Sequence, residues 1–124
     1  MISLELSKKL KAAGLEWKPK KGDFYGVFGT NSIELITIDR NDIVPRNIIW
    51  LPSLDQLLVE IEKRGYGWKL EKFHAYNLRR MEIYKVNDLL GCFGGNSPEE
   101  AAASALLWIL EGGAGHEQTD RKAN

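Results

Sequence analysis

One stretch decides the fold: Trp50-Leu-Pro-Ser-Leu-Asp-Gln-Leu-Leu-Val-Glu-Ile-Glu-Lys-Arg-Gly-Tyr-Gly-Trp68. Ser53 and Gln56 have the spacing of a capping box, in which each side chain accepts a hydrogen bond from a backbone N–H at the helix start. Apolar residues with the spacing of one buried helix face follow: Leu54, Leu57, Leu58 and Ile61. Gly65 can take the left-handed conformation that ends a helix. The stretch therefore predicts a capped amphipathic helix with a tryptophan on either side.

Length and composition predict one globular domain. The chain has 124 residues, of which 44% are hydrophobic and 27% charged, as is typical of soluble proteins. Its formal net charge is zero, which argues against nucleic acid as a bulk electrostatic partner. Cys92 is the only cysteine, so an intrachain disulfide is excluded. Because the sequence shows neither a signal peptide nor an apolar run long enough to span a membrane, we expect a cytoplasmic protein without a membrane partner.

The remaining patterns predict an α+β domain over residues 1–113, with a polar, flexible tail at 114–124. We expect an antiparallel sheet of about five or six strands, covered by helices, in the order αβββαββα. Alternating or β-branched segments place the strands at 23–28, 33–38, 43–50, 66–73 and 78–86. Glycine-rich sequence predicts a connection at 91–96, preceded by a short extended segment at 89–90.

The last predicted helix, from Pro98 to Glu111, is apolar on nearly all sides. Ser97 is its expected N-cap, with a proline at the first helical position. A helix of this kind is covered by its own sheet, by a neighbouring helix or by a second subunit. The candidate interface for a protein partner, either a second copy or another protein, comprises Ala105, Leu106, Trp108 and Ile109.

A shift of 51 residues aligns two similar segments of the sequence. The aligned pairs are Leu6 with Leu57, Leu10 with Ile61, Gly14 with Gly65, Trp17 with Trp68 and Lys18 with Lys69. Each segment would form a helix, a glycine stop and a strand that begins with tryptophan. The alternative is convergence, because the ends of many helices share this chemistry.

The sequence contains no recognisable catalytic, cofactor or metal motif. Its two histidines, His74 and His116, do not form zinc-type spacing with the single cysteine. The sequence has no nucleophile elbow, no Walker A loop and no dinucleotide-binding glycine motif. Gly91-Cys-Phe-Gly94 could clamp a nucleic-acid backbone, but a connection into the last helix is the simpler interpretation. We therefore expect a protein that is not an enzyme and needs no cofactor.

The first 21 residues carry a local basic excess, with six lysines, two glutamates and a net charge of +4. A solvent-exposed helix face and turn is the simpler explanation, and an anion or nucleic-acid patch is the sharper one. The candidate patch comprises Lys8, Lys9, Lys11, Lys18, Lys20 and Lys21.

Two resemblances extend these expectations. The run Asp88-Leu-Leu-Gly-Cys-Phe-Gly-Gly-Asn-Ser-Pro-Glu-Glu-Ala-Ala102 resembles the sheet-to-helix junction of HicB-type antitoxins, although Leu90 stands where that family usually has proline. The half of the chain from Ser53 to Leu110 resembles small bacterial and phage proteins of the phage ABA-sandwich type. That likeness lies in Gly65-Tyr66, Trp68 and Ala105-Leu106-Leu107. The first resemblance implies a toxin-neutralising or regulatory module, and the second implies a phage or bacterial accessory protein without known catalysis.

The sequence as a whole thus predicts a small accessory or protein-binding protein, encoded by a bacterium or a prophage. An antitoxin-like module and a nucleic-acid binder that uses the lysine-rich segment are the two alternatives.

Overall fold

The computed structural model confirms the α+β class but divides the strands between two sheets. It describes residues 2–18, 20–27, 29–30, 32–36, 48–73 and 78–113. The elements are α1 (Leu4–Ala12), β1 (Phe24–Val27), β2 (Ile33–Leu35), β3 (Ile48–Leu51), α2 (Leu54–Lys63), β4 (Gly67–Phe73), β5 (Leu78–Lys85), β6 (Asp88–Gly95) and α3 (Pro98–Leu110). Within these residues, each sheet has three antiparallel strands, in the orders β2-β1-β3 and β4-β5-β6.

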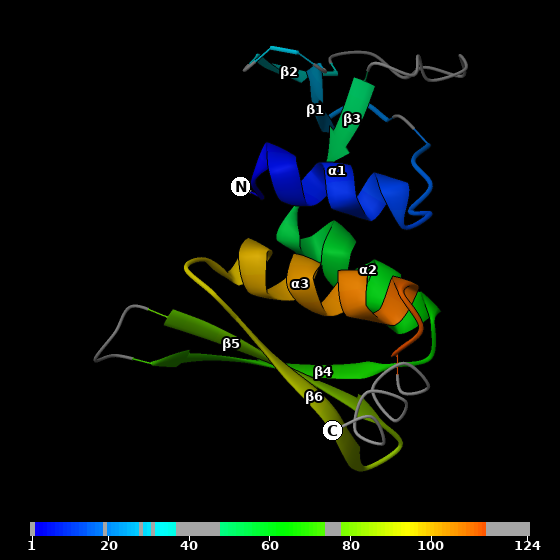
Figure 1. Ribbon diagram of the computed structural model, residues 1–124, viewed down its shortest axis with the longest axis vertical. Helices are drawn as coiled ribbons and strands as arrows, with labels where there is room; N and C mark the ends of the chain where they lie inside the picture. Colours follow the sequence, from blue (N-terminus) through cyan, green and yellow to red (C-terminus); the bar gives the residue numbers. More distant parts are fainter. Residues whose placement is uncertain are drawn as a thin grey trace.

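The two sheets lie at opposite ends of the molecule with the helices between them (Figure 1). The small β2-β1-β3 sheet lies next to α1, while α2 and α3 cover one face of the β4-β5-β6 sheet. α3 contacts both other helices as well as β5 and β6. The prediction of a single sheet of five or six strands was therefore wrong, because the helical layer separates the strands into two groups.

The predicted order αβββαββα was also wrong, because it omitted β6. Glycine-rich residues predicted as a connection instead belong to this eight-residue strand, in which Met81 of β5 pairs with Phe93. Pairing with β5 outweighs the low strand propensity of glycine. At Gly95 a side chain is excluded, since a Cβ atom there would lie 2.6 Å from the backbone nitrogen of Ala101. The glycine thus lets β6 approach the start of α3 closely.

The helix ends follow the sequence prediction. The capping box is formed, since the Gln56 N–H donates to Ser53 Oγ at 3.3 Å and the Ser53 N–H donates to Gln56 Oε1 at 2.9 Å. Ser97 caps α3 by accepting from the Glu100 N–H at 3.1 Å. The Glu100 carboxylate accepts from the Ser3 N–H at 2.9 Å, which joins the start of α3 to the start of α1.

α3 forms the centre of the core. Its alanines and Leu106 are fully buried against Met81 and Ile83 of β5 and against the apolar faces of α1 and α2. The small alanine side chains permit this close approach on several sides. The apolar character of α3 is therefore accounted for within the chain itself.

The 51-residue similarity holds for the helices and fails for the strands. Gly14 and Gly65 both have left-handed φ values, 103° and 87°, at the ends of α1 and α2. Trp68 lies in β4, but Trp17 lies in an irregular segment ahead of β1. The prediction of two helix-glycine-strand units was thus wrong for the first copy.

The predicted tail at 114–124 lies outside the described residues, as do parts of the predicted strands at 33–38 and 43–50. The strands at 23–28, 33–38 and 43–50 correspond to β1, β2 and β3, which are shorter within the described residues.

Candidate functional site

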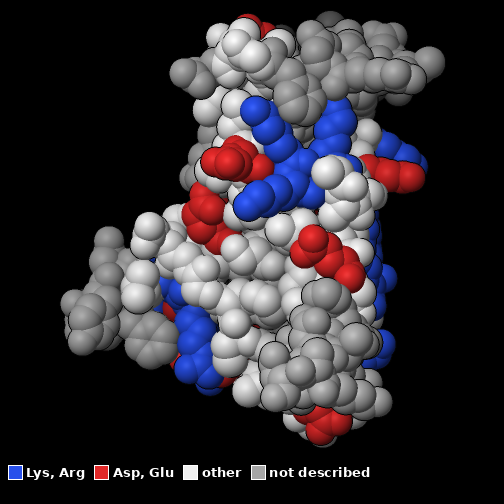
Figure 2. All heavy atoms as spheres, in the orientation of Figure 1, with Lys and Arg blue, Asp and Glu red and all other residues white. Residues whose placement is uncertain are grey.

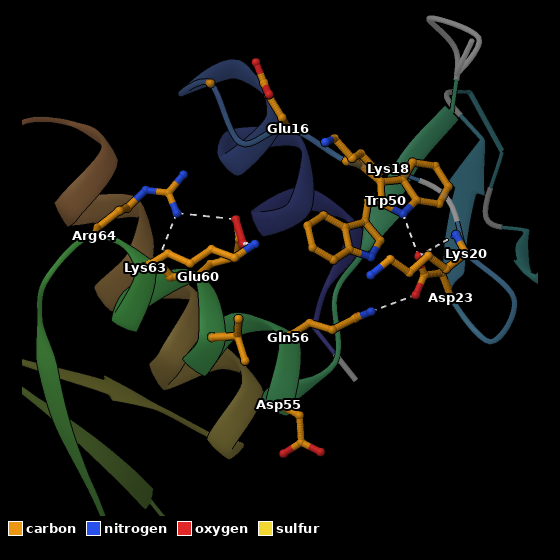
Figure 3. Close-up of a pocket in the computed structure, with 13 residues that line it drawn as sticks. Glu16, Lys18, Lys20, Asp23, Trp50, Asp55, Gln56, Glu60, Lys63 and Arg64 are labelled. Carbon is orange, nitrogen blue, oxygen red and sulfur yellow. Dashed lines mark hydrogen bonds and ion pairs between the residues drawn. The ribbon is translucent and has the colours of Figure 1, made fainter. Parts of the chain in front are cut away.

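A groove runs between α2 and the α1–β1 connection, and we call it the Trp50 groove (Figure 3). Its volume is about 830 Å³, in the range of small-molecule and peptide sites. The residues that line it are Gly14, Glu16, Trp17, Lys18, Lys20, Asp23, Trp50, Asp55, Gln56, Val59, Glu60, Lys63 and Arg64. The stretch that decides the fold therefore also builds one side of this groove.

Aromatic rings form the floor of the Trp50 groove. The indoles of Trp17 and Trp50 are stacked, with centroids 6.3 Å apart and planes only 4° from parallel. Trp17 also contacts the Tyr25 ring, with centroids 6.3 Å apart and planes at 35°. Tyr25 and Trp50 are paired across β1 and β3, so Trp17 contacts two aromatic rings of the small sheet, and Trp50 lies in the middle of the groove (Figure 3). Such a flat, rigid surface binds ligands with little loss of conformational freedom.

A buried carboxylate fixes the two walls to each other. Asp23 is 5% exposed and accepts three hydrogen bonds: from Trp17 Nε1 at 2.9 Å, from the Lys20 backbone N–H at 3.0 Å and from Gln56 Nε2 at 2.7 Å. Gln56 therefore caps α2 with its oxygen and holds Asp23 with its nitrogen. Because buried polar groups must be paired, these bonds fix the shape of the groove before any ligand arrives.

The acidic side chains of the groove are not available to bind a ligand. Glu60 accepts from Lys63 Nζ at 2.9 Å and from Arg64 Nη1 at 3.3 Å. In Figure 3 the carboxylates of Glu16 and Asp55 point away from the groove. The acidic groups are thus either bonded to the chain's own donors or directed outward.

Two basic side chains of the groove, in contrast, are available to bind a ligand. Among the described residues, the ammonium groups of Lys18 and Lys20 have no hydrogen-bond or ion-pair partner. Figure 3 shows these two lysines on one side of Trp50 and Lys63 and Arg64 on the other. The unsatisfied binding capacity of this groove is therefore cationic and aromatic.

The six lysines predicted as one patch are divided by the structure. Lys18 and Lys20 line the Trp50 groove, whereas Lys8, Lys9 and Lys11 lie on α1. Lys11 donates to the Ile48 carbonyl at 2.8 Å, and Lys21 is exposed in the turn before β1. Figure 2 shows basic side chains over the α1 level of the molecule with acidic groups beside them. The local basic excess is thus interrupted at the surface.

The predicted interface on α3 is mostly covered within the chain. Ala105, Leu106 and Ile109 are buried in the core, and Trp108 is half-buried against the Phe93 ring, with centroids 5.4 Å apart. Only the Trp108 part of this set reaches the surface.

A second polar cluster lies on the face of β5 opposite α3. Glu82 is 7% exposed and accepts from Arg80 Nη2 at 2.6 Å and from the Tyr84 hydroxyl at 2.9 Å. Arg80 Nη2 also lies 3.3 Å from Cys92 Sγ. The hydrogen bond to Glu82, together with burial, raises the pKa of Tyr84 above its ordinary value. The bonds to Glu82 lie within β5, and the contact of Arg80 with Cys92 joins β5 to β6.

Sequence reasoning found part of the groove and missed its centre. Lys18 and Lys20 were candidates, but Asp23 and the stacking of Trp17 on Trp50 were not identified. The capping-box residue Gln56 was a further local signal, but its second bond, to Asp23, spans 33 residues.

Comparisons of the chain with protein-family models, with curated proteins and with solved structures find no match. Both resemblances to known families therefore stay predictions. Among the described residues, no helix is long and apolar enough to cross a membrane. The described residues also contain no group of three or more His, Cys, Asp or Glu side chains that could hold a metal ion.

Proposed function

We propose that this chain is a small, non-catalytic accessory protein that binds an anionic ligand or partner segment in the Trp50 groove. The observation that carries the proposal is that positive charge in the groove is available to a ligand and negative charge is not. Carboxylates in the groove are bonded or turned away, whereas the Lys18 and Lys20 ammonium groups are not paired with any described residue.

The same lining supports a binding role over catalysis. The described residues of the groove include no serine, threonine, cysteine or histidine that could serve as a nucleophile. Asp23 already accepts three hydrogen bonds and is fixed in place. The fixed Asp23 would hold the shape of the groove, and the Lys18 and Lys20 ammonium groups would attract the anion electrostatically.

Isothermal titration of the protein with inorganic pyrophosphate at low ionic strength tests the proposal. We expect binding that weakens as salt is added, because exposed ion pairs are screened. The double variant Lys18→Gln/Lys20→Gln should bind on the order of tenfold more weakly, since each exposed ion pair contributes up to about 1 kcal/mol.

The matched control is Lys72→Gln/Lys85→Gln, which removes the same charge from exposed positions on β4 and β5. It should bind pyrophosphate as the wild type does. Equal losses in the two double variants would mean that net charge, not the groove, determines binding. Absence of binding at low salt would remove the proposal.

A second candidate function is nucleic-acid binding, as the lysine-rich segment predicts. It is favoured by the position of Lys18 and Lys20 beside a stacked aromatic surface.

A further inference from the structure

We propose that the anion bound in the Trp50 groove is a nucleoside phosphate, with its base on the Trp50 ring and its phosphate at Lys18 and Lys20. This inference rests on the proposed anion-binding function and names the ligand class for the same groove.

The Trp50 ring has the properties of a base-stacking platform. Trp17 lies parallel to it, with centroids 6.3 Å apart, and is held in turn by Tyr25 and by the hydrogen bond to Asp23. The ring lies in the middle of the groove, between the wall formed by the α1–β1 connection and the wall formed by α2 (Figure 3). Every nucleobase has a flat π face that stacks on such a ring.

The indole N–H of Trp50 supports the same ligand class. It is buried and makes no hydrogen bond within the part of the chain that the structure describes, whereas the Trp17 N–H is bonded to Asp23. An unpaired buried donor is unfavourable, and because this N–H lies in the ring plane, it would bind a sugar or phosphate oxygen at the edge of the ring, after a small rotation of the ring, and not the base stacked on its face.

The charges favour a nucleotide over an acidic peptide. A peptide with several carboxylates would use the ammonium groups but would leave the aromatic face without a role. A nucleoside phosphate uses both, because its planar base and its anionic group are one sugar apart. The chain's net charge of zero also fits a compact anion better than a long nucleic-acid duplex.

Titration with adenosine 5′-monophosphate, adenosine and inorganic phosphate separates the contributions. We expect the nucleotide to bind roughly tenfold more tightly than phosphate, since stacking on an aromatic side chain is of this order. Adenosine alone should bind more weakly than the nucleotide. Equal affinities for nucleotide and phosphate would overturn this inference while leaving the anion-binding function intact. Failure of both anions, and of pyrophosphate, would instead overturn the proposed function.

A single-stranded oligoadenylate distinguishes the two sources of this chemistry. Affinity per strand well above that of the mononucleotide would assign the site to nucleic acid, and equal affinity would assign it to a free nucleotide. Either result supports a nucleoside phosphate ligand. Binding of the strand that is no tighter than that of phosphate would contradict it.

Two variants test the position of the base. Trp50→Ala should remove the advantage of the nucleotide over phosphate. Val59→Glu adds a carboxylate at a groove position that is 49% exposed, so folding should be preserved and nucleotide binding lost. Leu89→Glu, at a position 48% exposed on β6, is the matched control and should bind as the wild type does. Nucleotide binding unaffected by Val59→Glu would contradict the assignment.

Discussion

Replacement of Asp23 by asparagine would remove part of the bond network that holds the Trp50 groove together. The Asp23 carboxylate accepts from Trp17 Nε1 and the Lys20 N–H through Oδ2, and from Gln56 Nε2 through Oδ1. An asparagine has one acceptor oxygen, which can replace Oδ2 and keep two of these bonds. Its NH₂ group would then face the Gln56 NH₂ group, donor against donor. Gln56 cannot simply turn, because its oxygen already accepts from the Ser53 N–H.

The expected loss of stability follows from the number of hydrogen bonds that each substitution changes. In Asp23→Asn, one hydrogen bond to a charged, buried group is lost and two others change from charged to neutral. The free energy of unfolding should therefore fall by about 2 kcal/mol. Asp23→Ala leaves three donors without an acceptor and should cost about 4 kcal/mol. Exposed Asp88 on β6 is the control, and Asp88→Asn should change stability by less than about 0.5 kcal/mol.

Urea denaturation followed by tryptophan fluorescence measures these differences. The reasoning requires the order Asp23→Ala, Asp23→Asn, Asp88→Asn, from least to most stable. An Asp23→Asn protein as stable as the Asp88→Asn protein would refute the claim that Asp23 fixes the walls of the groove.

Three further predictions concern other parts of the fold. Val86 is 91% exposed with φ at 59°, a strained conformation for a β-branched residue, so Val86→Asn should stabilise the protein by about 1 kcal/mol in the same assay. Gly95→Ala would force a Cβ atom to within 2.6 Å of the Ala101 nitrogen and should destabilise by about 3 kcal/mol or more, measured by thermal unfolding. Because the Tyr84 pKa is raised above that of an unfolded tyrosine, the free energy of unfolding should fall as pH rises from the ordinary value near 10.0 toward the raised value. Glu82→Gln should lower the Tyr84 pKa in a phenolate absorbance titration, and an unchanged pKa would contradict the assigned hydrogen bond.

Local sequence patterns predicted the helices well because their causes are local. The bonds between Ser53 and Gln56 lie within one turn, and the left-handed Gly65 follows directly after the helix. β6 was missed because its stability comes from the pairing of Met81 with Phe93, across a hairpin, and not from the propensity of its glycines. The strand pattern of one segment does not reveal which neighbour it will find.

The same distinction applies to the two candidate surfaces. The apolar pattern of α3 indicated burial, but periodicity cannot tell cover by the same chain from cover by a partner. Leu106 and Ile109 are in fact covered by the chain itself. The Trp50 groove depends on Trp17 stacking on Trp50 and on Asp23 bonding to Gln56, contacts that span 33 residues in the sequence. No local motif connects them.

The central claim is that anions bind in the Trp50 groove, and the indole N–H signals in a two-dimensional NMR spectrum test it most directly. The chain's four tryptophans give four such signals, and only Trp17 and Trp50 line the groove. Addition of pyrophosphate or adenosine 5′-monophosphate at low salt should shift the Trp17 and Trp50 signals and leave those of Trp68 and Trp108 in place. Shifts confined to Trp68 and Trp108, or no shifts at all, would contradict the account.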